Sequence, residues 1–310
     1  MDSRRVEVLI EQASVQTGLA NHKGALELLQ QALSLDPDHA RAHAFLAIVL
    51  VGLNRLPAAE IEVRMALHLD GNDHFSHYAA AFVYSAMRKL DEAWRHCLVS
   101  IDGDPDNAEP KVLGARICML REERAQAREL LDEALALEPS DADALTQLAR
   151  LEYNERNYAI AAARIEEALQ SNPSDLDAHV VAGLIDLARG DVDSAETHAR
   201  FVLNQNANER DGLTLWAAVK ARRSWYLGIW WRWNTWINNR SETSQVALMI
   251  GSFVIARIAM ILAGAFGFET LERVLVYTWL AFCAYTWFAP AIFRWMLEKD
   301  LGTVTLDPDY

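Results

Sequence analysis

Residues 139–174, PSDADALTQLARLEYNERNYAIAAARIEEALQSNPS, begin and end with the same Pro-Ser pair, 34 residues apart. A polar turn, Asn154–Asn157, separates the two halves of this stretch. Steps of 34 residues along the chain lead to equivalent positions, which read Pro37, Gly71, Pro105, Pro139, Pro173 and Ala207. A fixed period of this length is the sequence signature of a repeat architecture.

Small residues recur at the same step of 34. One row has no exception: Ala25, Ala59, Ala93, Ala127, Ala161 and Ala195. Two further rows are Ala13, Ala47, Ala81, Ala115, Ala149, Gly183 and Ala32, Ala66, Ser100, Ala134, Ala168, Val202. Small side chains let two helices approach closely where they cross, so the rows predict two packed helices in each repeat.

The residue that follows each of the six equivalent positions can cap a helix, because its side chain can accept a hydrogen bond from a free backbone N–H. These residues are Asp38, Asn72, Asp106, Ser140, Ser174 and Asn208. The pattern predicts that a helix begins directly after each of them.

The period, the small-residue rows and the proline marks together resemble the tetratricopeptide repeat (TPR) family, without insertion over residues 6–209. The resemblance implies an all-α fold, a right-handed α-solenoid in which neighbouring helix pairs bury one another's apolar faces. We expect a solenoid domain at 1–209 and a capping helix at 210–223. Its six repeats are expected at 6–39, 40–73, 74–107, 108–141, 142–175 and 176–209. The large aromatic residue early in the family's first helix is replaced here by His43, His77, Lys111, Leu145 and His179.

Charge and cysteine content indicate which partners and which compartment suit the chain. Residues 1–209 hold 35 Asp and Glu against 19 Lys and Arg, whereas residues 210–310 hold 8 against 10. Such an acidic domain argues against a nucleic-acid partner, which requires a basic surface. Cys97, Cys118 and Cys283 form no CxxC or Cys/His cluster, and the N-terminus has no signal-peptide pattern. We therefore expect the repeats to stay in the reducing cytoplasm.

Two apolar stretches follow the repeats. Residues 246–268 carry one charge in 23 and residues 274–293 carry none in 20. Since about 20 apolar residues cross a bilayer, we predict a two-span transmembrane hairpin at 244–296 and a tail at 297–310. Arg and Lys are concentrated on its outer flanks, so the positive-inside rule puts both termini in the cytoplasm. The compact style of the chain suggests a bacterial inner membrane.

The segment 224–243 joins the two parts and holds five of the ten tryptophans. Tryptophan favours the headgroup level of a bilayer, and nearby arginine favours anionic lipid. We expect a helix lying in the membrane interface, with Trp225, Trp230, Trp233 and Trp236 as its lipid contacts. The alternative is a soluble helix packed on the end of the solenoid.

Arg257 stands near the middle of the first predicted span. A charge there costs about 2.5–3.5 kcal/mol on insertion scales, so it needs a partner. We expect an acidic residue or lipid phosphate from a partner. Snorkelling or an internal network of hydroxyls and carbonyls is the alternative. Small residues at four-residue steps also predict close packing of this span, against its own hairpin, another copy of the chain or a different membrane protein.

In the TPR family the first helix of each pair lines a concave groove that holds peptides or protein surfaces. Carried over by the repeat phase, this resemblance implies a partner groove made of Ile48, Phe75, Tyr78, Phe82, Arg116, Met119, Arg150 and Tyr153. The early repeats offer apolar surface, and Arg116 and Arg150 favour a peptide with an acidic residue. Packing between repeats is the alternative role for each of these side chains.

The sequence offers no sign of catalysis. No P-loop, GxGxxG, HExxH or GxSxG motif is present, so we expect no enzyme and no cofactor. His39, His43, His74 and His77 have metal-ligand spacing but no adjacent cysteine, so we expect no metal site either.

The sequence therefore predicts a membrane-anchored scaffold or adaptor. It would present a cytoplasmic groove to a partner protein, or assist assembly of a membrane complex through its hairpin. The alternative is a structural subunit that forms homo-oligomers through solenoid or hairpin contacts.

Overall fold

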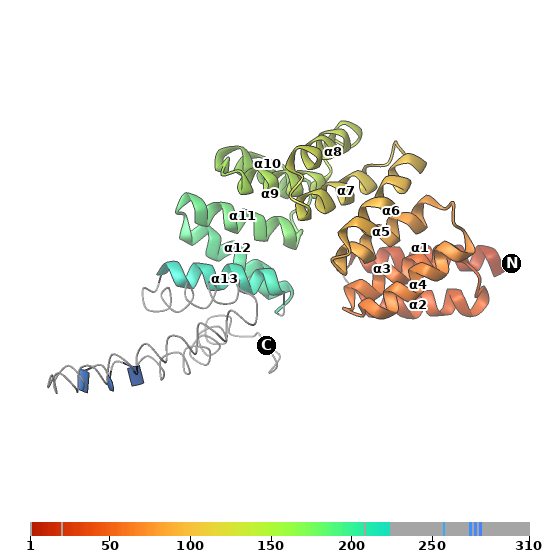
Figure 1. Ribbon diagram of the computed structural model, residues 1–310, viewed down its shortest axis with the longest axis horizontal. Coiled ribbons are helices and arrows are strands. Elements are labelled where there is room, and N and C mark those ends of the chain that lie inside the picture. Colours follow the sequence, from red (N-terminus) through yellow and green to blue (C-terminus); the bar gives the residue numbers. More distant parts are fainter. Residues whose placement is uncertain are drawn as a thin grey trace. The chain divides into compact units, whose positions relative to one another are not determined.

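The computed structural model describes residues 2–19, 21–207 and 209–223, together with Arg257, Arg273, Val274, Val276, Tyr277, Trp279 and Leu280. Across the described residues there are thirteen named helices and no strand (Figure 1). Two compact units divide the chain, Met1–Ser174 (unit 1) and Asp175–Tyr310 (unit 2). The predicted all-α repeat architecture is confirmed.

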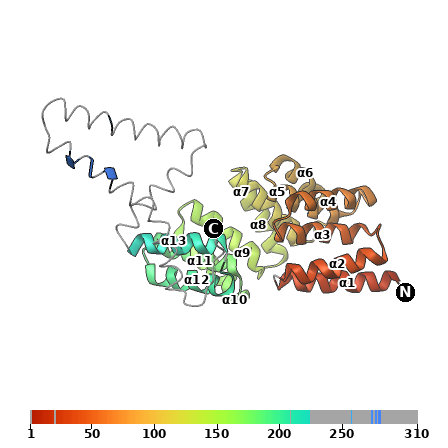
Figure 2. The ribbon, with the colours of Figure 1, turned by 90° about the horizontal axis from the view of Figure 1, so that it is seen from below.

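Unit 1 holds five helix pairs. Their bounds are α1 Asp2–Gly18, α2 His22–Leu35, α3 Ala40–Gly52, α4 Leu56–Leu69, α5 His74–Ala86, α6 Leu90–Gly103, α7 Ala108–Leu120, α8 Arg124–Leu137, α9 Ala142–Asn154 and α10 Tyr158–Ser171. The two helices of each pair pack against each other, as α1 and α2 do in Figure 2. First helices of successive pairs also touch, whereas no comparable contact joins successive second helices within the described part of unit 1. The first helices α1, α3, α5, α7 and α9 are therefore the more closely spaced, inner row of the stack.

The small-residue rows lie where the helices meet. Every alanine of the row from Ala25 to Ala195 has no exposed surface, and the same holds for Ala13, Ala47, Ala81, Ala115 and Ala149. Burying such residues removes little apolar area per residue, so the pairs are held by many close backbone approaches rather than by a few large side chains.

The helix starts correct one prediction. The predicted caps Asp38, Asn72, Asp106, Ser140 and Ser174 all lie in turns, and each first helix is capped by the next residue. Those caps are His39, Asp73, Asn107, Asp141 and Asp175, whose side chains accept hydrogen bonds from first-turn backbone N–H groups. The reason is the turn itself, because proline or its equivalent takes the first central position and the next residue the second. Asn208 lies outside the described residues.

The turns inside the five helix pairs that follow α1–α2 repeat one backbone feature that the sequence pattern did not reveal. Asn54, Arg88, Glu122, Arg156 and Gly190 all have positive φ, between 56° and 91°, and follow one another at the 34-residue step. Only Gly190 is free of the steric cost that a Cβ meets in this region. Four non-glycine residues therefore hold a conformation that the surrounding pair imposes on them.

At four of the five positions that lack the family's aromatic residue, all but that of Leu145, a polar pair takes its place. His43 Nδ1 lies 2.6 Å from Glu62 Oε2, His77 Nδ1 lies 2.9 Å from His96 Nδ1, and Lys111 Nζ lies 2.7 Å from Glu133 Oε2. Each joins the first helix of a pair to the second. In unit 2, His179 and His198 repeat the arrangement at 2.8 Å. The position thus keeps its task of joining two helices, but hydrogen bonds take the place of ring packing.

Unit 2 holds α11 Leu176–Arg189, α12 Val192–Gln205 and α13 Arg210–Arg223. Helix α13 packs on both other helices through Leu215 and Trp216, neither of which is exposed. A Cβ at Gly183 would collide with Leu215, which explains why the small-residue row ends in glycine. Packing of this kind is what a capping helix requires.

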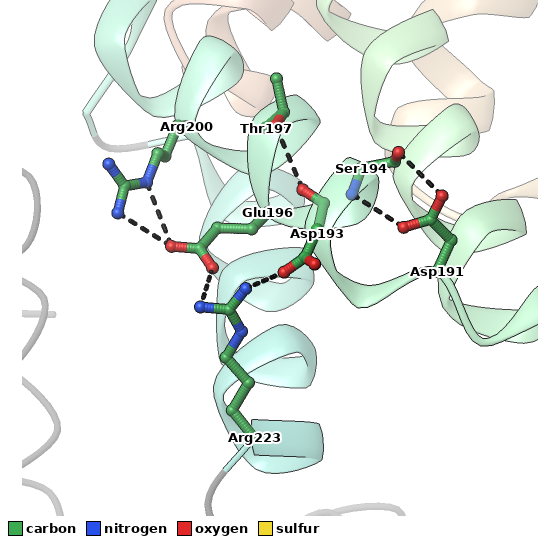
Figure 3. A network of polar contacts seen from close by, with 7 residues as sticks. All are labelled: Asp191, Asp193, Ser194, Glu196, Thr197, Arg200 and Arg223. Atoms are coloured by element: carbon green, nitrogen blue, oxygen red, sulfur yellow. Dashed lines mark hydrogen bonds and ion pairs between the residues drawn. The ribbon is translucent and has the colours of Figure 1, made fainter.

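A charged network fixes the last turn of α13 (Figure 3). The carboxylate of Glu196, largely buried on α12, pairs with Arg200 at 2.8 Å and with Arg223 at 2.8 Å. Arg223 also pairs with Asp193. Because a buried carboxylate is costly without a partner, these contacts hold the end of α13 on the first half of α12.

The predicted interfacial segment 224–243 and tail 297–310 lie outside the described residues, as do nearly all residues of the predicted hairpin 244–296. Within the part of the chain that the structure describes, no helix has the length and apolarity needed to span a membrane.

The histidine pair predicts a pH dependence. Gly71 O accepts a hydrogen bond from His77 Nε2–H, so a neutral His77 offers a lone pair at Nδ1 to His96 Nδ1–H. Burial, and then His77, hold the pKa of His96 below its usual value of 6.5. The neutral pair therefore stabilises the fold above pH 6.5, and the stabilisation is lost as the pH falls through the lowered pKa.

We expect thermal unfolding to shift to lower temperature between pH 7.5 and pH 5.5, because burial and His77 disfavour the protonated form of His96 in the folded state. His96→Phe keeps a ring against Tyr84 and removes the titrating group, so its melting temperature is expected to depend less on pH. His74→Gln, which changes an exposed ring, serves as the control. An unchanged pH dependence in His96→Phe would contradict this assignment.

The network of Figure 3 predicts which arginine holds α13. In hydrogen exchange measured by mass spectrometry, Arg223→Ala should speed exchange in the last turns of α13, because Glu196 and Asp193 lose their link to that helix. Arg222→Ala removes an equal charge from an exposed neighbour and should leave exchange unchanged. Equal protection in all three proteins would show that the network does not fix the helix.

Candidate functional site

A cavity of about 500 Å³ opens on the inner row of unit 1. Its lining comes from α1, α3, α5, the end of α6 and the start of α7. The lining residues are Ser14, Thr17, Gly18, Arg41, Phe45, Ile48, His74, Phe75, Tyr78, Ser100, Asp104, Asn107, Glu109 and Pro110. The volume falls within the usual range for ligand clefts, and the spread over four repeats gives it the shape of a binding groove rather than of a core defect.

Three rings form one wall of this cavity, called here the aromatic wall: Phe45, Phe75 and Tyr78. The ring centroids of Phe45 and Phe75 lie 5.3 Å apart, and those of Phe75 and Tyr78 lie 6.0 Å apart, both stacked. Since two of the rings share α5 and the third lies on α3, contact between first helices builds the wall. It offers a rigid apolar surface for a partner side chain.

The charges around the wall are unequal. The Arg41 guanidinium carbon lies 5.1 Å from the Phe75 ring centroid, so this cation is stacked on the wall. Glu109 is exposed, yet it stands in a concave surface where protein displaces water on several sides. This desolvation, with the nearby acids Glu138, Asp141 and Asp143, raises the pKa of Glu109. No positive side chain among the described residues thus pairs with the Glu109 carboxylate.

Tyr78 keeps its proton. Burial and the negative charge of Glu109 raise the pKa of its hydroxyl, although Arg116 opposes them. The hydroxyl is therefore a neutral hydrogen-bond donor at the edge of the aromatic wall.

Ser100 is the unusual member of the lining. It is 1% exposed, and its Oγ has no hydrogen-bond partner among the described residues. Leaving such a group unpaired costs about 1–3 kcal/mol. The equivalent positions in the other repeats of unit 1 are Ala32, Ala66, Ala134 and Ala168, all fully buried. The fold therefore accepts alanine here, and the hydroxyl brings it no contact.

The predicted groove residues divide into two groups. Ile48, Phe75 and Tyr78 line the cavity, whereas Phe82, Arg116, Met119, Arg150 and Tyr153 do not. Phe82 and Met119 pack against the core, and the Tyr153 ring lies 5.7 Å from that of Tyr158. Arg116 is exposed on α7 and Arg150 lies partly buried on α9.

Sequence reasoning missed Phe45, Ser100, Asp104 and Asn107 as site residues. Ser100 left a visible signal, because it interrupts a row that is otherwise small and apolar. Asp104 and Asn107 left none, since they sit in a turn whose orientation only packing decides. Trp225, Trp230, Trp233 and Trp236 lie outside the described residues. Arg257 is described as helical and exposed.

Catalytic and metal chemistry find little support in these side chains. The described residues contain no group of three or more His, Cys, Asp or Glu side chains placed to hold a metal ion. Burial raises the pKa of both Cys97 and Cys118 to about 12, which keeps these thiols protonated and unreactive. What the cavity supplies is an apolar wall, one uncompensated carboxylate and free hydrogen-bonding groups.

Comparison with known proteins finds related repeats. Two family models described as tetratricopeptide repeat match residues 18–82 and 146–203. The type IV pilus assembly protein PilF of Pseudomonas aeruginosa is 28% identical over 157 residues, which are 48% of this chain. The match spans 62% of the length of that relative.

Solved structures share the fold. TTC0263, a thermophilic TPR protein of Thermus thermophilus, has a TM-score of 0.54 at 21% identity, covering 59% of this chain and 99% of that protein. PilW, described as a widely conserved type IV pilus biogenesis factor, has a TM-score of 0.52 at 15% identity, covering 68% and 97%. These likenesses show that the described helix pairs have the tetratricopeptide repeat fold, and the two family models identify residues 18–82 and 146–203 as tetratricopeptide repeats.

Proposed function

We propose that this chain is a non-catalytic adaptor that holds a segment of a partner protein against the inner row of unit 1. The observation that carries the proposal is the cavity with its aromatic wall, because partly buried stacked rings that line a cavity beside hydrogen-bonding groups suit a peptide better than a reaction. Proteins with TPR folds mediate protein–protein interactions, which supports the same class of function.

We further propose that the predicted hairpin at 244–296 anchors the adaptor in a membrane, with the repeats on the cytoplasmic side. Two apolar stretches of sequence and the flanking arginines support this. The name of the Pseudomonas relative, a type IV pilus assembly protein, supports a role in the assembly of a protein complex. The adaptor would then bring its partner to the bilayer at which assembly takes place.

Site-specific photo-cross-linking tests the groove. A benzoylphenylalanine placed at Tyr78 in the full chain, expressed in its native host, is expected to give a discrete adduct with a partner protein, because that ring stands in the cavity. The matched control is Ile61, which is 65% exposed on α4 and belongs to the outer row. Identical adducts from both positions, or none from Tyr78, would contradict the proposal. An adduct with a second copy of this chain would support the homo-oligomer alternative instead.

Extraction of membranes tests the anchor. After carbonate treatment the full chain should remain in the membrane pellet, since two apolar spans resist removal by high pH. A variant lacking residues 244–296 should pass into the supernatant. Recovery of the full chain in the supernatant would disprove the predicted hairpin while leaving the groove untouched.

A further inference from the structure

The charges that line the cavity indicate the chemistry of its occupant. Acidic groups gather at one part of its lining, where Asp104 directly follows α6 and Glu109 lies in the first turn of α7. Glu109 makes no side-chain hydrogen bond or ion pair with another described residue. The charges that raise its pKa are those of Glu138, Asp141 and Asp143, all of the same sign. A cation from outside the chain would relieve this repulsion.

Two arginines of this chain are candidates for neutralising the charge of Glu109. Arg41 lines the cavity, but its guanidinium is stacked on Phe75 at 5.1 Å and belongs to the aromatic wall. Arg116 follows Glu109 on α7 by seven residues, about 10 Å along the helix axis. Neither forms an ion pair with Glu109 in the structure described. Glu109 is therefore available to pair with a basic side chain of a partner, since neither Arg41 nor Arg116 pairs with it.

Ser100 points to a ligand independently of charge. Ser100 lines the same cavity, and its buried Oγ has no hydrogen-bond partner among the described residues. A peptide segment in the cavity would bring a main-chain carbonyl, which accepts a hydrogen bond from such a hydroxyl. Alanine at the equivalent position of every other repeat in unit 1 makes the serine a local addition rather than a requirement of the fold.

The charge of the whole domain acts in the same direction. Residues 1–209 hold 35 acidic against 19 basic residues, so the surrounding field attracts a basic partner and repels an acidic one. From the sequence alone, Arg116 and Arg150 favoured a bound peptide that contains an acidic residue. In the structure neither lines the cavity, whereas Asp104 and Glu109 do.

We propose that the cavity binds a protein segment in which an apolar side chain packs on the aromatic wall and a nearby lysine or arginine pairs with Glu109, while Ser100 Oγ donates to the segment's main chain. The inference rests on the proposed function, because it names the chemistry of the partner for the same groove. It adds a sign of charge and two residues, Ser100 and Glu109, that the adaptor role alone does not require.

Selection from a displayed library of random seven-residue peptides tests the proposal. The target is the purified full chain in mild detergent, and binding of the selected peptides is measured by fluorescence anisotropy. We expect the selected peptides to combine an apolar residue with lysine or arginine. Glu109→Gln should weaken their binding about tenfold and remove the preference for the basic residue. Glu129→Gln, on the exposed outer face of α8, changes the same charge and should leave binding unaltered.

A second variant separates binding from folding. Ser100→Ala should weaken binding about fivefold without lowering the melting temperature, because the hydroxyl has no partner within the fold. Enrichment of acidic peptides, no charge preference, or full affinity in Glu109→Gln would overturn this inference and leave the adaptor role standing. If no peptide is selected, or if binding survives Tyr78→Ala, the groove itself is wrong and both proposals fall.

Discussion

The close approach of two helices at one alanine per repeat is the constraint on which the rest depends. Ala25, Ala59, Ala93, Ala127, Ala161 and Ala195 have no exposed surface, and a larger side chain at any of them would push a helix pair apart. Because every pair is built on the same spacing, the first helices of unit 1 fall into one closely spaced inner row. The aromatic wall exists because that row brings α3 beside α5.

Much of this could be predicted from the sequence, since a 34-residue period fixes helix number, pairing and buried faces together. The features that the sequence could not predict are local details of backbone and side-chain geometry, which the 34-residue period does not determine. The caps lie one residue later than predicted because the turn takes two residues. Positive φ at Arg88, Glu122 and Arg156 was hidden, because these residue types give no sign of it. Ile48, Phe75 and Tyr78 were predicted for the groove, but only packing shows that Ser100 and Asp104 join them.

Polar pairs and unpaired groups divide the molecule into parts that hold the fold and parts left open to a partner. The pair of His77 with His96, and the ion pairs of Glu196 with Arg200 and Arg223, join helix to helix. Among the described residues Ser100 Oγ has no hydrogen-bond partner and Glu109 has no ion pair, and both residues line one cavity. Leaving the buried hydroxyl of Ser100 unpaired costs stability, and under the proposed function a bound segment would offset that cost.

In the proposed adaptor, a partner segment lies along the inner row of unit 1. A cryo-electron microscopy structure of the full chain, purified with its cross-linked partner in lipid nanodiscs, measures this directly. We expect density for an extended segment that crosses α3, α5 and the start of α7 and covers Phe45, Phe75 and Tyr78. Density for the partner on the outer helices α4, α6 and α8, with the cavity empty, would contradict it.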